Sequence, residues 1–163
     1  YVRGNTSEVT RKLQKDVIDH ILMEDTAKII DNIQKIMKDI TTKEYDLDQI
    51  TIPINLSKPF EHGEEVGGEY YDGANWNNRY IGESIISGDM VRYFKAKSCG
   101  NLPYNQWVSY LDADKVKKAG ITPDYDWIVD RTLRSPLENI LASAGISWEL
   151  IKGYENVDDM FGG

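Results

Sequence analysis

The chain has 163 residues, of which 40% are hydrophobic and 28% charged, and its formal net charge is −8. This composition is ordinary for a globular protein and excludes a wholly disordered chain, a collagen-like repeat or a membrane protein, since no apolar run approaches the roughly 18–20 residues of a spanning helix. The single cysteine, Cys99, excludes a disulfide framework within the chain and is typical of a reducing, intracellular setting.

Two amphipathic helices are predicted at the start of the chain, over about 6–24 and 26–40. Apolar residues recur at helical spacing in both segments, and Asn5 followed by Glu8 resembles a capping box. The joint between the segments is short, so we expect the helices to pack as a hairpin. The chain begins at Tyr1 without an initiator Met, and we therefore expect a piece of a longer protein.

Short strands and irregular segments are predicted for the middle of the chain. Pro53 places the segment 50–54 at a strand start or a sheet edge, because proline cannot donate a ladder hydrogen bond. Residues 61–90 are rich in glycine, acidic and aromatic residues, and they predict irregular structure with a short helix near 73–82. Alternating residues predict strands over 91–96 and 107–111.

The last long helix is predicted over 124–144, with Asp124 as its cap and Gly145 as its end. Pro136 lies inside this pattern and should kink the helix or split it in two. The fold class is therefore α+β, mainly helical. We expect the helical hairpin and the C-terminal helix to form a base, and the small irregular β-containing region to form a tip.

Charge is unevenly distributed along the chain. Residues 61–90 contain seven acidic side chains and one basic side chain, Arg79, whereas residues 91–118 contain six basic and two acidic side chains. The net negative charge by itself argues against nucleic-acid binding. The segregation nevertheless allows one positive face on an acidic surface.

Residues that enzymes usually need are few. His20 falls in the first predicted helix, where a packing or surface role is expected, and His62 lies in an acidic loop whose metal-ligand spacing is irregular. No phosphate-binding loop or nucleophile motif is present, so the residues favour a binding or structural module. Two alternatives stay open: an acidic protein–protein adaptor module, and a hydrolase whose 61–72 loop binds a divalent metal.

Four stretches in chain order carry a more specific pattern. They are Val2-Arg3-Gly4-Asn5-Thr6-Ser7-Glu8 with the helix after it; Leu56-Ser57-Lys58-Pro59 after a short strand; Trp76-Asn77-Asn78-Arg79 with Ser87-Gly88-Asp89-Met90-Val91-Arg92-Tyr93; and the run 118–141, which contains Pro136-Leu137-Glu138. Together they resemble the C-terminal thumb region of family B DNA polymerases of archaea and tailed phages. The resemblance covers nearly the whole chain.

This resemblance implies part of a DNA-directed DNA polymerase, a nucleotidyltransferase. In that family the thumb grips the primer–template duplex from the minor-groove side during DNA replication, mostly through phosphates, because it must hold every sequence equally. The palm supplies the catalytic aspartates, so we expect no catalytic residue and no cofactor in this chain, which alone would be inactive; Mg²⁺ is expected in the missing palm. The implied partners are duplex DNA and the palm and fingers, in the same or a separate chain. The implied location is inside an archaeal or phage-infected cell, in the cytoplasm or nucleoid.

The resemblance also implies a set of site residues. The candidate DNA contacts are cations with hydroxyl or amide side chains near them: Arg3, Asn5, Ser7, Lys12, Ser57, Lys58, Asn78, Arg79, Arg92 and Lys95. Residues 1–152 would form the thumb domain. The tail 153–163 resembles the clamp-binding peptide that ends phage members of the family, and it would bind a sliding clamp through Val157, Met160 and Phe161.

Overall fold

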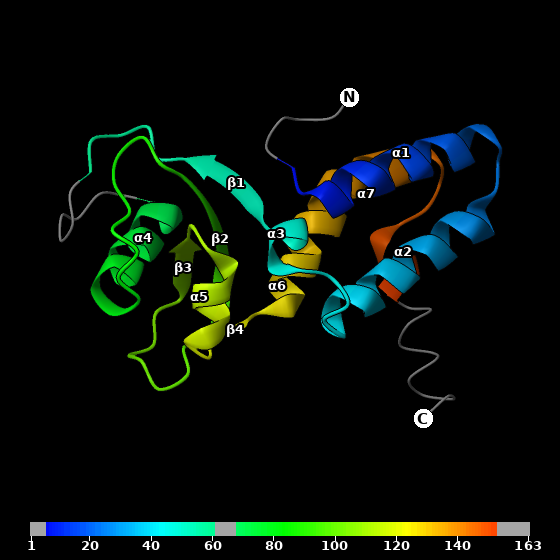
Figure 1. Ribbon diagram of the computed structural model, residues 1–163. Coiled ribbons are helices and arrows are strands. Elements are labelled where there is room, and N and C mark those ends of the chain that lie inside the picture. Colours follow the sequence, from blue (N-terminus) through cyan, green and yellow to red (C-terminus); the bar gives the residue numbers. More distant parts are fainter. Residues whose placement is uncertain (1–5, 61–67, 153–163) are drawn as a thin grey trace.

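Two lobes lie side by side in the computed structural model, which describes residues 6–60 and 68–152 (Figure 1). The helical lobe contains α1 (Glu8–Leu22), α2 (Thr26–Thr41), α6 (Tyr125–Val129), the π-helical turn η1 (Asp130–Arg134) and α7 (Ser135–Ser143). The sheet lobe contains β1 (Ile52–Asn55), α4 (Glu69–Tyr80), β2 (Met90–Ser98), β3 (Trp107–Tyr110) and α5 (Ala113–Lys118). The chain passes between them through α3 (Leu47–Ile50) and β4 (Thr122–Pro123). This arrangement confirms the α+β, mainly helical class with a helical base and a β-containing tip.

The predicted helical hairpin is confirmed, but its cap is not Asn5. Ser7 is the N-cap of α1, where its Oγ accepts a hydrogen bond from the Thr10 backbone N–H at 3.1 Å. Asp25 caps α2 in the same way through the Lys28 backbone N–H at 3.2 Å. Since the side-chain acceptor satisfies a backbone donor that the helix leaves unpaired, both helices begin at a polar residue.

The predicted interruption of the C-terminal helix is confirmed as a π-helical turn, while the helical conformation continues from Tyr125 to Ser143 without a break. Asp124 caps α6 by accepting from the Trp127 backbone N–H at 3.1 Å, and Gly145 follows the end of α7 with a φ of +77°. Between α6 and α7 the chain makes a π-helical turn, and Pro136 lies in the first turn of α7. Proline has no backbone N–H and fits best in a first helical turn. Pro136 therefore interrupts the α-helical hydrogen bonds before it and lies in the first turn of α7.

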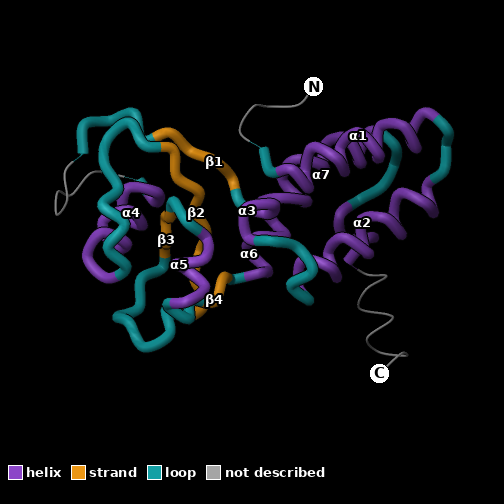
Figure 2. The backbone as a smooth tube through the Cα atoms, in the orientation of Figure 1, coloured by secondary structure: helices purple, strands orange, loops and turns teal. Residues whose placement is uncertain are grey.

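The strands lie together in the order β1-β2-β3 (Figure 2), each pairs antiparallel with its neighbour, and β4 also pairs antiparallel with β2. Pro53 lies opposite Arg92 on the edge strand β1, as predicted. The helix α4 extends over Glu69–Tyr80 and is longer than the predicted segment 73–82. It packs closely on β3, because Gly73 has no side chain to separate the two backbones. The sequence did not predict α5.

The hydrophobic core runs through both lobes. Its main cluster joins α1 and α2 residues such as Leu13 and Ile33 to sheet residues such as Phe94 and Val108, and to Trp148 near the end of the described chain. A second cluster lies only in the sheet lobe and consists of Leu56, Phe60, Tyr71, Ala74, Ile85 and Val91. The shared core fixes the tip on the base. Among the described residues, no helix combines the length and apolar character needed to cross a membrane.

Candidate nucleic-acid interface

The chain exposes a cation beside two hydroxyl groups at the outer end of the sheet lobe. Ser57 and Lys58 follow β1 and are both exposed. The Lys58 carbonyl accepts a hydrogen bond from Ser87 Oγ at 3.0 Å, and the Lys58 backbone N–H donates to the Tyr71 hydroxyl at 2.7 Å. The backbone N–H and carbonyl of Lys58 are therefore both hydrogen-bonded, while its side chain is exposed to solvent. We call Ser57, Lys58 and Ser87, with the exposed Ile86 and Met90, the tip surface.

Asn78 holds the loop that carries Ile86 and Ser87 of the tip surface. Its Nδ2 donates to the Ile85 carbonyl at 2.8 Å, and its Oδ1 accepts from the Ile85 backbone N–H at 2.6 Å. The loop is also tied to the residue that follows β1, because the Gly88 backbone N–H donates to the Leu56 carbonyl at 2.8 Å. The amide of Asn78 is thus occupied by the loop, and its role in the structure is to position Ser87. Arg79 lies next to it, exposed, with its guanidinium 5.4 Å from the centre of the Tyr80 ring.

The two predicted contacts on β2 are half-buried. Arg92 donates from Nη1 to the Thr51 carbonyl at 2.8 Å, and its Nε lies 4.0 Å from Asp48 Oδ1, so the guanidinium ties β2 to the segment around α3. Lys95 lies opposite Trp107 in the β2–β3 register.

An aromatic group lies on the same part of the sheet. Tyr93 contacts both Trp107 and Trp127, and its hydroxyl accepts from Arg131 Nη2 at 2.9 Å. Burial raises the pKa of Tyr93, which the Arg131 charge partly offsets. The contacts of Arg92 and Arg131 with neighbouring elements give both side chains a structural function.

On α1, one predicted contact is buried and the other is exposed. Ser7 is 1% exposed, and its hydroxyl lies 2.7 Å from Thr10 Oγ1 in addition to capping the helix. Lys12 forms an exposed ion pair with Glu8, with 3.0 Å between Nζ and Oε1. The hydrogen bond and charge of Lys12 hold the pKa of the Glu8 carboxyl below its ordinary value.

The structure separates the predicted contacts into three places. Ser57 and Lys58 gather on the tip surface with Asn78 behind them, Arg92 and Lys95 lie on β2, and Lys12 lies on α1 in the helical lobe. Several predicted residues lie outside the described part of the chain: Arg3, Asn5, His62, Val157, Met160 and Phe161.

Some candidate residues were missed by the sequence-based selection. Arg11 and Lys15 are exposed beside Lys12, and their i, i+4 spacing was the signal that they share a helix face. Ser87 was missed because only the fold brings it to Lys58. His20 has a local role, with Nδ1 2.8 Å from the carbonyl oxygen of Asp16 one turn earlier. Within 6–60 and 68–152, no group of three or more His, Cys, Asp or Glu side chains could hold a metal ion.

The fold defined by these two lobes occurs in a known class of protein. It matches a solved structure of the family B DNA polymerase from the hyperthermophilic archaeon Pyrobaculum calidifontis, with a TM-score of 0.58 and 18% identity, over 83% of this chain and 18% of that one. No protein-family model matches the chain.

Two curated relatives give the same result from sequence. The chain is 25% identical over 169 residues to DNA polymerase 1 of Saccharolobus solfataricus, which covers 98% of this chain and 18% of the relative. It is 24% identical over 164 residues to DNA polymerase 1 of Sulfolobus acidocaldarius, covering 99% and 17%. The chain thus spans about a fifth of the length of these relatives. The predicted resemblance to family B DNA polymerases is confirmed, and the chain is similar to one part of such an enzyme.

Proposed function

We propose that this chain is the thumb part of a DNA-directed DNA polymerase and grips the primer–template duplex during replication. The similarity to archaeal DNA polymerase 1 over 98% of the chain carries the proposal, because an unrelated acidic adaptor would not account for a match of that extent. Nucleotidyl transfer and the Mg²⁺ it needs would belong to the palm, so the chain alone would be inactive. Its partners would then be the palm and fingers, and its location intracellular.

The tip surface supports duplex binding by its chemistry. Lys58 offers a positive charge on a fixed backbone, and the exposed Ser57 precedes it, whereas the Ser87 hydroxyl donates its proton to the Lys58 carbonyl and helps to hold that backbone. Cations and hydroxyls suit phosphate oxygens, which occur at every step of a duplex regardless of sequence. In this proposal Lys12, Ser57, Lys58, Arg79 and Lys95 contact the backbone directly, together with Arg3 and Asn5.

The remaining candidates act differently in the proposal. Ser7, Asn78 and Arg92 already direct their polar atoms at neighbouring protein groups, at distances of 3.1 Å or less. They would therefore be positioning residues, which hold α1, the tip loop and β2 in place. Removing one should weaken binding without removing a phosphate contact.

The test is salt-dependent duplex binding by the Lys58→Gln variant. A protein that neutralises Z phosphates shows a slope of log K against log salt of about −0.9Z, so losing one contact should flatten the slope by about 0.9. Fluorescence anisotropy with two duplexes of unrelated sequence should give the same change for both. Lys35→Gln, an exposed lysine on α2, is the matched control and should leave the slope unchanged.

Two outcomes would count against duplex gripping. The first is a wild-type chain that shows no salt-dependent affinity for either duplex. The second is a Lys58→Gln variant whose loss of affinity differs between the two sequences, since phosphate contacts carry no sequence information.

The tail 153–163 is a separate part of the proposal. Its acidic residues would act as a tether, and Val157, Met160 and Phe161 would be the anchors that enter an apolar pocket of a sliding clamp. Deleting residues from 157 onward in the full polymerase should lower processivity with the clamp and leave synthesis without it unchanged. Unchanged processivity with the clamp present would refute the tether.

A further inference from the structure

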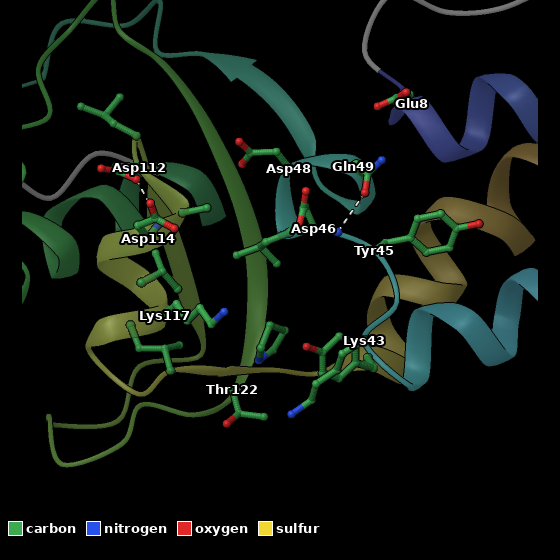
Figure 3. Close-up of a pocket in the computed structure, with 17 residues that line it drawn as sticks. Glu8, Lys43, Tyr45, Asp46, Asp48, Gln49, Asp112, Asp114, Lys117 and Thr122 are labelled. Atoms are coloured by element: carbon green, nitrogen blue, oxygen red, sulfur yellow. Dashed lines mark hydrogen bonds between the residues drawn. The ribbon is translucent and has the colours of Figure 1, made fainter.

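A groove of about 880 Å³ separates the two lobes on one face of the molecule. Figure 3 shows side chains entering it from two sides: Asp46, Asp48 and Gln49 from the segment around α3, and Asp112, Asp114 and Lys117 from the segment around α5. Glu8, at the start of α1, also lines it, as do Lys43, Tyr45, Ile121, Thr122, Pro123 and Tyr125. We call this space the interlobe groove.

The rim of the interlobe groove is strongly acidic. Five carboxylates line it, from Glu8, Asp46, Asp48, Asp112 and Asp114, against two ammonium groups, from Lys43 and Lys117. Lys43 lies 6.0 Å from the centre of the Tyr125 ring, so its charge is directed at an aromatic face. The lining groups alone sum to −3, counted as two positive and five negative groups. Because Lys12 lies 3.0 Å from Glu8 and Arg92 lies 4.0 Å from Asp48, the excess negative charge belongs to Asp46, Asp112 and Asp114. The carboxylates repel the phosphate groups of DNA and attract a cationic ligand.

Part of the floor of the interlobe groove is apolar. Val116, Ile121 and Pro123 are buried beneath it, Leu47 is half-buried, and Leu111 keeps 44% of its surface exposed at its edge. Leu47 and Leu111 therefore offer a small apolar surface between the polar groups, a combination in which polar groups set orientation and apolar contact adds affinity. A small inorganic cation would leave this floor uncovered. The lining fits a ligand that carries both positive charge and apolar side chains.

We propose that the interlobe groove binds a segment of a partner protein in which Lys or Arg side chains alternate with apolar ones. The basic side chains would meet the carboxylates on the two walls, and the apolar ones would cover the floor beside Leu111. Both walls contribute to the site, so the partner would bridge the helical and sheet lobes. The proposal does not depend on the tip surface, whose residues do not line the groove, although Lys12, another proposed phosphate contact, lies 3.0 Å from the groove residue Glu8.

The test uses the 163-residue chain and a short fluorescein-labelled peptide of alternating Arg and Leu. Anisotropy should show binding that weakens as salt increases, because charge pairs at a partly exposed rim are screened. A peptide with Glu in place of Arg should not bind, and one with Ser in place of Leu should bind more weakly. The Asp114→Asn variant should lose roughly two- to fivefold in affinity, the effect of one exposed charge pair.

Two further variants separate the groove from the general acidity of the surface. Leu111→Ala should lower the affinity for the Arg–Leu peptide and leave the affinity for the Arg–Ser peptide unchanged, because the substitution removes only apolar contact. Asp31→Asn, an exposed carboxylate on α2 outside the groove, is the matched control and should bind the peptide as the wild type does. An equal loss in Asp31→Asn and Asp114→Asn would overturn the proposal, as would no binding at low salt.

Discussion

Replacing Gly73 by Ala tests how closely α4 packs on the sheet. A Cβ at this position would lie 2.6 Å from the Ser109 backbone nitrogen, 2.7 Å from Ser109 Oγ and 2.9 Å from the Val108 carbonyl carbon. Two of these atoms belong to the backbone of β3, which is paired with β2 and cannot rotate away as a side chain can. The added methyl group must therefore push α4 off the sheet.

Two effects of opposite sign decide the stability of the Gly73→Ala variant. Alanine is favoured over glycine inside a helix by about 1 kcal/mol. Overpacking of a tightly packed site costs about 1–3 kcal/mol, and contact with a rigid backbone places this site at the upper end. We therefore expect the free energy of unfolding to fall by about 2 kcal/mol.

The same displacement would reach the tip surface. Ser109 Oγ donates to the Tyr70 carbonyl at 2.7 Å, and Asn77 Nδ2 donates to the Ser109 carbonyl at 2.9 Å. Two hydrogen bonds therefore join Ser109 of β3 to α4, and a shift of α4 would strain both. One residue further along the helix, Asn78 holds the tip loop. Duplex affinity should therefore fall together with stability.

Urea unfolding followed by far-ultraviolet circular dichroism measures the stability change. Arg79→Ala, an exposed change on the same helix, is the control and should alter the free energy of unfolding by no more than about 0.5 kcal/mol. A Gly73→Ala protein more stable than the wild type would refute the reasoning, because helix propensity would then outweigh the backbone contact.

Three other predictions concern single side chains. Ser7→Ala should lower the free energy of unfolding by about 1–2 kcal/mol in thermal melts, since the Ser7 cap is buried; a melting temperature equal to that of the wild type would contradict this. Asn78→Ala removes two hydrogen bonds, and we expect a stability loss of about 1–3 kcal/mol and weaker duplex binding with an unchanged salt slope, whereas a flatter slope would identify Asn78 as a phosphate contact. Burial raises the pKa of Tyr110 above its ordinary value of about 10, so above that pH the unfolded chain loses a proton that the folded chain keeps. Stability should therefore be full below about pH 10 and fall as the pH rises further, with a smaller fall in Tyr110→Phe; urea midpoints that do not change between about pH 9 and about pH 11 would contradict this.

The parts of the fold that depend on local signals were predicted from the sequence. Apolar spacing indicated α1 and α2, Pro136 indicated the interruption between α6 and α7, and Pro53 indicated an edge strand. The extent of α4 was not predicted, because this helix contains Gly73 and many aromatic and amide residues, and it forms through its contact with β3. Such stabilisation by packing leaves little local signal.

The candidate site was predicted less completely than the fold. Residue type and motif selected Ser7, Asn78 and Arg92, but their polar atoms are occupied by protein groups that only the folded chain brings near. The interlobe groove could not be predicted, because Glu8, Asp48 and Asp114 are far apart in the sequence.

The path of the chain between the lobes has a consequence for the order of folding. The chain leaves the helical lobe before β1 and returns after β4, and both of these strands pair with β2. The base then closes across the whole intervening segment: Thr10 Oγ1 donates to the Thr132 carbonyl at 2.6 Å, a sequence separation of 122 residues. Bringing such distant segments together costs loop-closure entropy, and this cost precedes the long-range contacts that offset it. We therefore expect the sheet lobe to fold before the helical lobe is complete. The α1–α2 hairpin would pack into the base only after α6 and α7 have been synthesised.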